Sequence, residues 1–367
     1  MPRSCVTLLS GGLDSLLALR LMTLQGLAAT AVHTINCFHG SEAAEARKER
    51  LRADALRLGA RDIVFPDITD EVIAVTRAPR FGYGRHRNAC IDCRLRTIAA
   101  GFRVMREVAA DFVASGEVVG QRPMSQRRDA IAIADREIAS WGFPGLLLRP
   151  LSAKLLEKTV PEAEGWVDQG RLYAISGRSR GEQMALAREL AIGPYPAPAG
   201  GCLLTDAGFS ARLGDLMRFH PGWGAADVEL LKVGRHFLPA ERTRIVASRN
   251  EAENARLEEL ARPDDLFYIN AERNGAVVML RGEATAAAET LAAGLAIHFS
   301  RMREAGHARV ARWRLAPGET DRSEFAAAAT PPEAAWEAES AMKAAGPCRT
   351  GSSRAGPGSK QRAAGAP

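Results

Sequence analysis

The feature that most constrains the fold is the alternation of short apolar runs with helix-like patterns over the first half of the chain. The runs CVTLL, AATAVHTI and DIVF read as strands, and segments with helical periodicity stand between them. Gly26 and Gly59 fall where the C-terminal caps of those helices are expected. Because parallel strands need helical crossovers, this pattern predicts an α/β domain with a doubly wound parallel sheet, continuing to about Leu190.

Domain boundaries are indicated by changes in composition. Proline and glycine concentrate in GPYPAPAGG at 193–201, which cannot continue a helix or a central strand. We therefore expect a first domain over 1–198 and a smaller α+β domain over 199–315. Residues 316–367 contain few large apolar side chains and are expected to form a disordered tail.

Length and charge set broad limits on function. The 367 residues suffice for two domains, and 46% hydrophobic with 25% charged residues excludes wholesale disorder. A net charge of +6 permits nucleic-acid binding but is small for this length. The sequence shows no membrane segment and no signal peptide, so we expect a cytoplasmic protein. Its six cysteines are then more suited to metal binding or catalysis than to disulfides.

The motif Ser10-Gly11-Gly12-Leu13-Asp14-Ser15 lies between the first predicted strand and the first predicted helix. Its two glycines allow close approach of a phosphate, and the helix N-terminus supplies N–H groups and a positive dipole end. The motif lacks the lysine of a Walker loop. A plain capped turn, with Ser10 as the cap, is the alternative.

The form SGGLDS resembles the PP-loop of enzymes that cleave ATP between the α and β phosphates. This resemblance implies that Ser10 and Ser15 contact pyrophosphate and that Asp14 holds Mg²⁺ and serves catalysis. Gly116, in SGEVVG, matches a glycine of the ATP site in thiouridylases, which usually have histidine where Glu117 stands. ATP and Mg²⁺ are the implied cofactors. The implied ATP-binding residues are Ser10, Gly11, Gly12, Asp14, Ser15 and Gly116.

Three cysteines form the second motif. Cys90 and Cys93 make a CxxC at the start of a predicted helix, and Cys202 follows the Pro/Gly-rich segment. Thiolates near a helix N-terminus suit metal ligation or nucleophilic attack. Three thiolate ligands leave one position open, as a catalytic 4Fe-4S cluster requires, whereas structural zinc usually takes four.

These cysteines resemble those of the tRNA thiolation branch of PP-loop enzymes, in which N-P-D-x-x-C carries the first catalytic cysteine. Cys93 matches that position, and Cys202 is the counterpart of the second catalytic cysteine. Cys90 stands where the cluster-free enzymes have aspartate, as in cluster-dependent thiolases. The leading interpretation is a cluster bound by Cys90, Cys93 and Cys202. The alternatives are a persulfide relay on Cys93 and Cys202, or a zinc site completed by His86, His39 or Cys37.

Basic residues outside these motifs are candidates for contacts to RNA or to ATP phosphates, with a solvated surface as the alternative. They are Arg122, Arg128, Arg149, Lys154, Arg178 and Arg180. The second domain, in KVGRHF and ASRNEAENARLEEL, resembles the NFACT-R type of RNA-binding module, which implies added affinity for tRNA.

Together the resemblances predict a tRNA sulfurtransferase that adenylates a base carbonyl, that of uridine as the leading candidate, and replaces the oxygen with sulfur. The expected partners are tRNA and an external sulfur donor, either a cysteine desulfurase, a sulfur carrier or sulfide; a homodimer is left open and no membrane is expected. One alternative is a PP-loop ligase or amidotransferase acting on a small molecule. Another is a non-catalytic RNA adaptor that binds nucleotide.

Overall fold

The computed structural model describes residues 3–40, 44–193, 195, 202–272, 275–314 and 322–336. The chain divides into two compact units, Met1–Gly234 and Arg235–Pro367. Within the described ranges, none of the helices combines the length and the apolar character that crossing a membrane requires.

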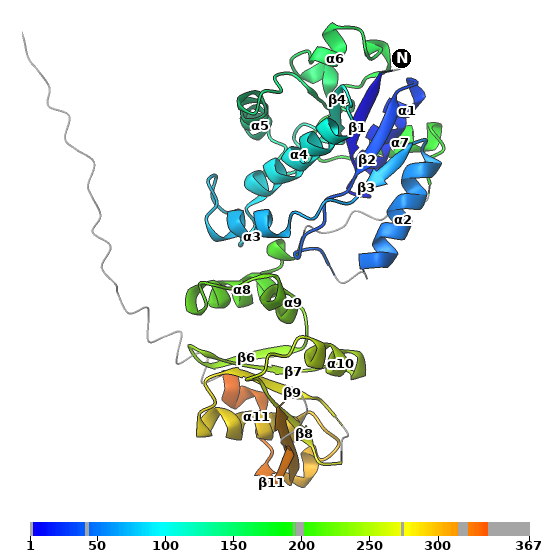
Figure 1. The fold of residues 1–367 in the computed structure, drawn as a ribbon. Helices are drawn as coiled ribbons and strands as arrows, with labels where there is room; N and C mark the ends of the chain where they lie inside the picture. Colours follow the sequence, from blue (N-terminus) through cyan, green and yellow to red (C-terminus); the bar gives the residue numbers. More distant parts are fainter. Residues whose placement is uncertain are drawn as a thin grey trace, which may run out of the picture. The chain divides into compact units, whose positions relative to one another are not determined.

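The first unit is built on a parallel sheet of five strands in the order β3-β2-β1-β4-β5 (Figure 1). Cys5 of β1 pairs with Ala29 on one side and with Phe112 on the other. The chain forms β2 and β3 on one side of β1 and then β4 and β5 on the other side, so a topological switch point lies between β1 and β4. The doubly wound sheet predicted from the alternation is confirmed. Its strands are β1 Ser4–Leu8, β2 Ala28–Val32, β3 Asp62–Val64, β4 Phe112–Ser115 and β5 Leu147–Leu148.

Helices cover both faces of this sheet because successive strand side chains point to opposite faces. Cys5 and Phe112 pack into a core with α1 (Leu13–Leu24), α2 (Ala44–Arg57) and α7 (Gly181–Glu189). Val6, Val32 and Val113 pack against α4 (Cys90–Glu107) and α5 (Arg128–Ser140). The unit also contains α3 (Thr69–Arg77), α6 (Val160–Ala163) and three short turns of 3₁₀ helix at Ala153–Leu155, Gln169–Arg171 and Leu203–Thr205.

Two further helices, α8 (Ala207–Phe219) and α9 (Ala225–Leu231), belong to the first unit. Phe209 of α8 and Trp223 each meet Phe38 edge-on, with ring centroids 6.3 and 6.4 Å apart. The boundary between the units therefore falls after Gly234 and not after position 198. The boundary could not be placed from sequence, because the sequence of an amphipathic helix does not indicate which domain its apolar face packs against. Most of the Pro/Gly-rich segment, 194 and 196–201, lies outside the described residues.

The second unit contains a six-stranded antiparallel sheet in the order β11-β10-β8-β9-β7-β6. The helix α11 (Ala286–His298) packs its alanines and leucines onto one face of this sheet, over Phe237, Tyr268 and Val310. The predicted smaller α+β domain is thus present. Its other elements are β6 Arg235–Ala240, β7 Thr243–Ala247, α10 Glu251–Glu259, β8 Leu266–Asn270, β9 Val278–Gly282, a 3₁₀ turn Arg303–Ala305, β10 His307–Arg314 and β11 Arg322–Ala328.

The strand β11 corrects the expectation that everything after position 315 is disordered. It pairs along β10, with Phe325 opposite Val310, and the chain continues as a helical segment at 332–336. Alanines suffice here because the segment lies very close to α11: a Cβ added at Gly294 would be 2.0 Å from Thr330 Oγ1. Residues 315–321 and 337–367, which include Cys348, lie outside the described part.

Candidate functional site

The loop that joins β1 to α1 is closed by the hydroxyl groups of Ser10 and Ser15. Ser15 Oγ donates to the Gly12 carbonyl at 2.7 Å and accepts from the backbone N–H of Ser10 at 3.2 Å. Gly11 has φ +83°, a left-handed conformation that favours glycine, and an added Cβ would meet Leu51 at 2.7 Å. The predicted strand–loop–helix arrangement is therefore present, and Ser15, 5% exposed, shapes the loop from within.

The loop after β4 touches this phosphate loop. A Cβ added to Gly116 would lie 2.5 Å from the carbonyl carbon and oxygen of Asp14. Any side chain larger than hydrogen would push the two loops apart. Because β1 and β4 are neighbours at the switch point, both loops lie at the edge of the sheet where open α/β proteins bind ligands. Gly116 therefore lies beside the loop that joins β1 to α1.

A chain of hydrogen-bonded side chains positions the carboxylate of Asp14. Gln121 Nε2 donates to Asp14 Oδ2, and Gln183 Nε2 donates to Gln121 Oε1 at 2.9 Å. Arg180 Nη2 lies 3.4 Å from the same Asp14 oxygen. Asp14 Oδ1 is buried and has no hydrogen-bond partner.

This arrangement suits a divalent cation beside bound phosphate. A buried carboxylate oxygen without a partner is costly unless a ligand satisfies it, and Mg²⁺ prefers such oxygens together with phosphate. Asp14 is therefore the residue that would hold Mg²⁺, and Arg180 is a candidate contact to phosphate at this loop. Gln121 and Gln183 could not be predicted from sequence, because their hydrogen bonds join residues far apart in the chain. The sequence indicates only that Gln121 directly follows the strand-end segment SGEVVG.

The three predicted cysteines come together in the first unit. Cys90 and Cys93 occupy the first turn of α4, and Cys202 precedes the turn Leu203–Thr205, whose Leu203 N–H donates to the Phe38 carbonyl at 3.2 Å. Burial, together with the nearby thiols of Cys202 and Cys90, raises the pKa of Cys93 to about 12. Although Cys202 is exposed as a whole residue, desolvation of its thiol and the nearby Cys90 raise its pKa too.

The raised pKa values mean that Cys93 and Cys202 are protonated near pH 7 in this arrangement. A bound cation stabilises thiolates and would lower those pKa values. Three soft sulfur donors match an iron–sulfur cluster in type and number. Among the described residues, however, no group of three or more His, Cys, Asp or Glu side chains is already arranged to hold a metal ion.

The residues proposed to complete a zinc site lie in other settings. The rings of His39 and His33 are tilted, with centroids 5.6 Å apart, and His39 contacts Asn36; burial lowers the pKa of His39 to about 4. Cys37 is buried, which raises its pKa to about 12. His86 lies in the loop before Cys90, where its backbone N–H donates to Asn88.

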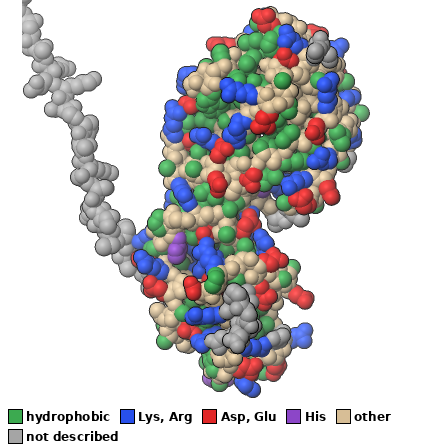
Figure 2. Space-filling model, viewed as in Figure 1, with side chains coloured by type: hydrophobic (Ala, Val, Ile, Leu, Met, Phe, Trp, Pro, Cys, Tyr) green, Lys and Arg blue, Asp and Glu red, His purple; other side chains and the backbone are tan. Residues whose placement is uncertain are grey.

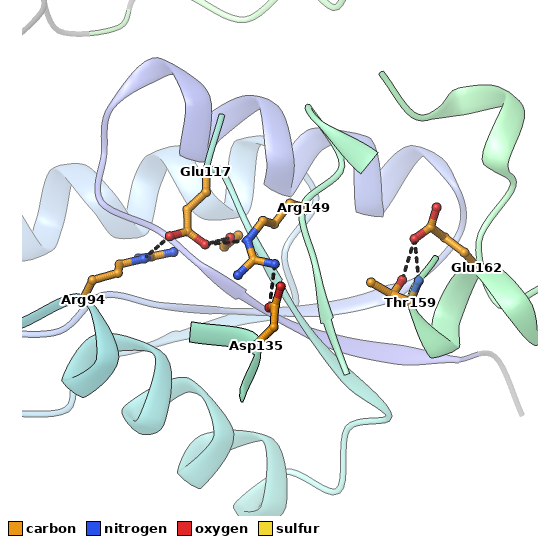
Figure 3. A network of polar contacts seen from close by, with 7 residues as sticks. Arg94, Glu117, Asp135, Arg149, Thr159 and Glu162 are labelled. Atoms are coloured by element: carbon orange, nitrogen blue, oxygen red, sulfur yellow. Dashed lines mark hydrogen bonds and ion pairs between the residues drawn. The ribbon is translucent and has the colours of Figure 1, made fainter. Parts of the chain in front are cut away.

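A buried ion network connects α4, which carries Cys90 and Cys93, to the loop after β4 and to α5 (Figure 3). Arg94, next to Cys93, donates from Nε to Glu117 Oε1 at 2.8 Å, and Arg149 donates from Nε to Glu117 Oε2 at 2.9 Å. Burial raises the pKa of Glu117, but Arg94 and Arg149 together lower it to about 2. Glu117 directly follows Gly116, so its ionised carboxylate ties α4 to the loop that contacts Asp14.

The structure encloses one of the residues predicted to contact RNA or ATP phosphates. Arg149 is 3% exposed, and its guanidinium is shared between Glu117 and Asp135, the latter at 2.9 Å. An enclosed arginine that already pairs with two carboxylates is not a surface contact for RNA. The structure assigns it to the support of Glu117 instead. Glu117 and Arg94 are the functional candidates that the sequence did not single out.

The remaining predicted basic residues lie at the surface. Arg122, Arg128, Lys154 and Arg178 are all exposed. Arg128 donates to the carbonyl of Leu155 at 3.1 Å. In the view of Figure 2, Lys and Arg side chains are interspersed with Asp and Glu across the surface. Net charge alone therefore does not locate a binding surface for RNA.

Comparison with known families and structures identifies the second unit most directly. Residues 234–332 match the family described as the NFACT protein RNA binding domain, a range that contains all six strands of the antiparallel sheet. The predicted NFACT-R-like module is thereby confirmed as a family match for this part of the chain. No curated protein matches the chain.

Solved structures of nucleotide-using enzymes resemble the chain at low identity. A 4-thiouridine synthetase in complex with RNA and ATP is 18% identical, with 52% of each chain covered and a TM-score of 0.33, so this chain spans about half the length of that synthetase. The U34-tRNA thiolase NcsA from Methanococcus maripaludis, which carries a 4Fe-4S cluster, is 16% identical (63% of this chain, 72% of that chain, TM-score 0.27). The NAD+ synthetase from Burkholderia pseudomallei is 16% identical (63% and 81%, TM-score 0.28).

Proposed function

We propose that this protein is an ATP-dependent tRNA sulfurtransferase that adenylates a base carbonyl, that of uridine as the leading candidate, and replaces its oxygen with sulfur. The observation that carries this proposal is the connection between the two motifs. Asp14 contacts Gly116, Gly116 precedes Glu117, and Glu117 pairs with Arg94 beside Cys93. The loop that joins β1 to α1 and the helix that carries Cys90 and Cys93 are thus connected through residues 116 and 117, which supports the proposal.

In the first half of the reaction, the phosphate loop binds Mg-ATP. Backbone N–H groups at the N-terminus of α1 and the guanidinium of Arg180 neutralise the β and γ phosphates. Asp14, whose buried Oδ1 has no hydrogen-bond partner, would hold Mg²⁺. The base oxygen then attacks the α phosphorus, and the bond between the α and β phosphates breaks, releasing pyrophosphate. The product is a base whose oxygen carries AMP.

In the second half, hydrosulfide adds to the activated carbon and AMP leaves with the original oxygen. With hydrosulfide as the sulfur source, a thiocarbonyl and AMP are formed, the proton of hydrosulfide goes to the ring nitrogen that lost its proton on adenylation, and no oxidant or reductant is needed. Cys90, Cys93 and Cys202 would supply the thiolates for a 4Fe-4S cluster. When bound, the cluster would supply Lewis-acid iron able to bind sulfide.

A persulfide relay is the competing use of the same cysteines. It would carry sulfur on Cys93 or Cys202 and would consume the second thiol as reductant. The attacking species would need a thiolate with a lowered pKa. Burial raises the pKa of both residues, but ligation and a relay alike need the thiolate, so it is the presence of a third thiol, Cys90, that favours ligation.

The second unit supplies affinity for the RNA in this proposal, because residues 234–332 match an RNA-binding family. A sulfur donor external to the chain, as sulfide or a protein-bound sulfur, completes the partners. A PP-loop ligase or amidotransferase that acts on a small molecule would use the phosphate loop alone and would leave the three gathered thiols without a role.

The test measures the products of ATP turnover with and without unmodified tRNA. The proposal predicts equal amounts of AMP and pyrophosphate, formed only with tRNA, and loss of both in Asp14→Asn. Formation of AMP without RNA but with an amine acceptor would establish the ligase. Absence of turnover with every RNA and donor, despite ATP binding, would establish the adaptor.

A further inference from the structure

The loop before α4 contains none of the basic residues that the sequence predicted to contact RNA or phosphate. Residues 78–91 carry three arginines, Arg80, Arg85 and Arg87, and no acidic residue. Arg80 pairs with Glu137 at 2.7 Å. Arg85 is exposed and has no carboxylate partner within the described residues.

The fold holds this loop in a fixed shape. Both oxygens of the buried Asp92 accept from the loop backbone, at Arg80 and at Phe81, each at 3.1 Å. Gly84 N–H donates to the Asn88 carbonyl at 3.0 Å. Charged side chains on such a preorganised loop lose less entropy on binding than they would on a flexible one.

A second acid-free arginine segment packs against this loop. Residues 118–128 carry Arg122, Arg127 and Arg128 and no Asp or Glu. The amide of Asn88 contacts Cys90 Sγ at 3.2 Å and Met124 Sδ at 3.4 Å, so Met124 of the second segment lies beside the cysteine.

Two of these arginines have exposed side chains that make no hydrogen bond or ion pair within the described residues. Arg127 is neutralised by Asp129. Arg85 and Arg122 are both exposed, and no carboxylate within the described residues pairs with either of them. The guanidinium of Arg87 lies 5.5 Å over the Tyr83 ring, which orients it without removing its charge.

We infer that Arg85 and Arg122 form, with Arg87, a second RNA-binding surface, located on the first unit beside Cys90, that binds the phosphate backbone next to the base being modified. Guanidinium groups bind phosphates through paired N–H donors, and phosphate contacts fix the register of an RNA without reading its sequence. This inference deepens the proposed function and rests on it, since it names residues that would present the RNA to the thiols.

The test is equilibrium binding of a fluorescent unmodified tRNA transcript to the full chain, without sulfur donor, over a series of salt concentrations. Arg85→Gln and Arg122→Gln should each weaken binding by about threefold to tenfold and lower the slope of log K against log salt by about 1. ATP affinity should not change. Arg188→Gln on α7, which removes an exposed arginine from a helix on the opposite face of the sheet, is the matched control.

Affinity and salt slope equal to the control in both variants would overturn the inference and leave the second unit as the sole RNA contact. The binding assay measures no sulfur transfer, so it does not depend on the sulfurtransferase proposal. If that proposal fails and this inference holds, the two variants still lose RNA affinity, while the tRNA acquires no sulfur in a separate turnover assay. Unchanged melting temperatures, expected for two exposed side chains, confirm that the loss is one of contact.

Discussion

Gly116 lies against the main chain of Asp14, so closely that an added Cβ would be 2.5 Å from the Asp14 carbonyl oxygen. This contact joins the loops after β1 and β4, the two central strands. It also explains on steric grounds why a glycine occupies the position before Glu117.

Gly116→Ala should therefore separate the two loops. We expect weaker ATP binding and a free energy of unfolding lower by about 1–3 kcal/mol, the usual cost of forcing an extra methyl group into a packed site. Isothermal titration with ATP and urea denaturation measure the two effects. Gly222→Ala is the control, because a Cβ there would meet nothing within 4 Å. Equal ATP affinity in both variants would contradict the contact.

Glu117→Gln tests the buried ion network. The side chain is 2% exposed, and its loss leaves a positive charge of Arg149 less well compensated, so we expect a loss of about 3 kcal/mol in the free energy of unfolding at pH 7. Asp135→Asn is the control: its carboxylate is 51% exposed, and the loss should be at most about 1 kcal/mol.

The same variant predicts a pH dependence. Because the pKa of Glu117 in the folded protein is lowered from 4.5 to about 2, its ionisation stabilises the fold fully above pH 4.5 and loses this effect as the pH falls toward 2. The difference in stability between the wild type and Glu117→Gln should therefore shrink over that range. A difference that stays constant down to pH 2 would contradict the assigned ionisation.

Two truncations test the role of β11. Removal of all residues after 321 takes away the strand that pairs with β10 and the buried Ala335, so the second unit should melt at a lower temperature. Removal of residues after 336 should leave its melting temperature unchanged. Calorimetry of both chains measures the comparison, and equal melting temperatures would show that β11 adds no stability.

Much of the first unit is predictable from sequence because its signals are local. The apolar runs, the glycines and the motif from Ser10 to Ser15 each determine structure within a few residues. The gathering of Cys90, Cys93 and Cys202 needed the family resemblance in addition, since nothing local brings Cys202 to α4. The helix α8 belongs to the first unit because Phe209 packs against Phe38, which is far away in the sequence.

The polar surroundings of the site were the least predictable part. Arg149 and Arg122 look alike in sequence, yet the first is enclosed by Glu117 and Asp135 and the second is exposed. Only the packing of β5 and α5 distinguishes them. The hydrogen bonds from Gln183 to Gln121 and from Gln121 to Asp14 likewise form only when α7 is placed beside α1.

The use of the cysteines is tested by single alanine substitutions. Protein purified without oxygen should be brown and should lose colour and activity in air, as expected for a 4Fe-4S cluster bound by thiolates. Cys90→Ala, Cys93→Ala and Cys202→Ala should each prevent stable iron binding, measured by iron analysis. An active, colourless Cys90→Ala protein with extra sulfur on Cys93 or Cys202 would instead support the persulfide relay, and one equivalent of zinc would support the zinc site.

The most direct test of the central claim is nucleoside mass spectrometry of unmodified tRNA incubated with the full chain, Mg-ATP and sulfide without oxygen. The account predicts one new thionucleoside, heavier than its parent by the difference between sulfur and oxygen, formed in step with AMP and absent with Asp14→Asn. Stoichiometric AMP formation with no sulfur in any nucleoside, in protein that retains its metal, would contradict it.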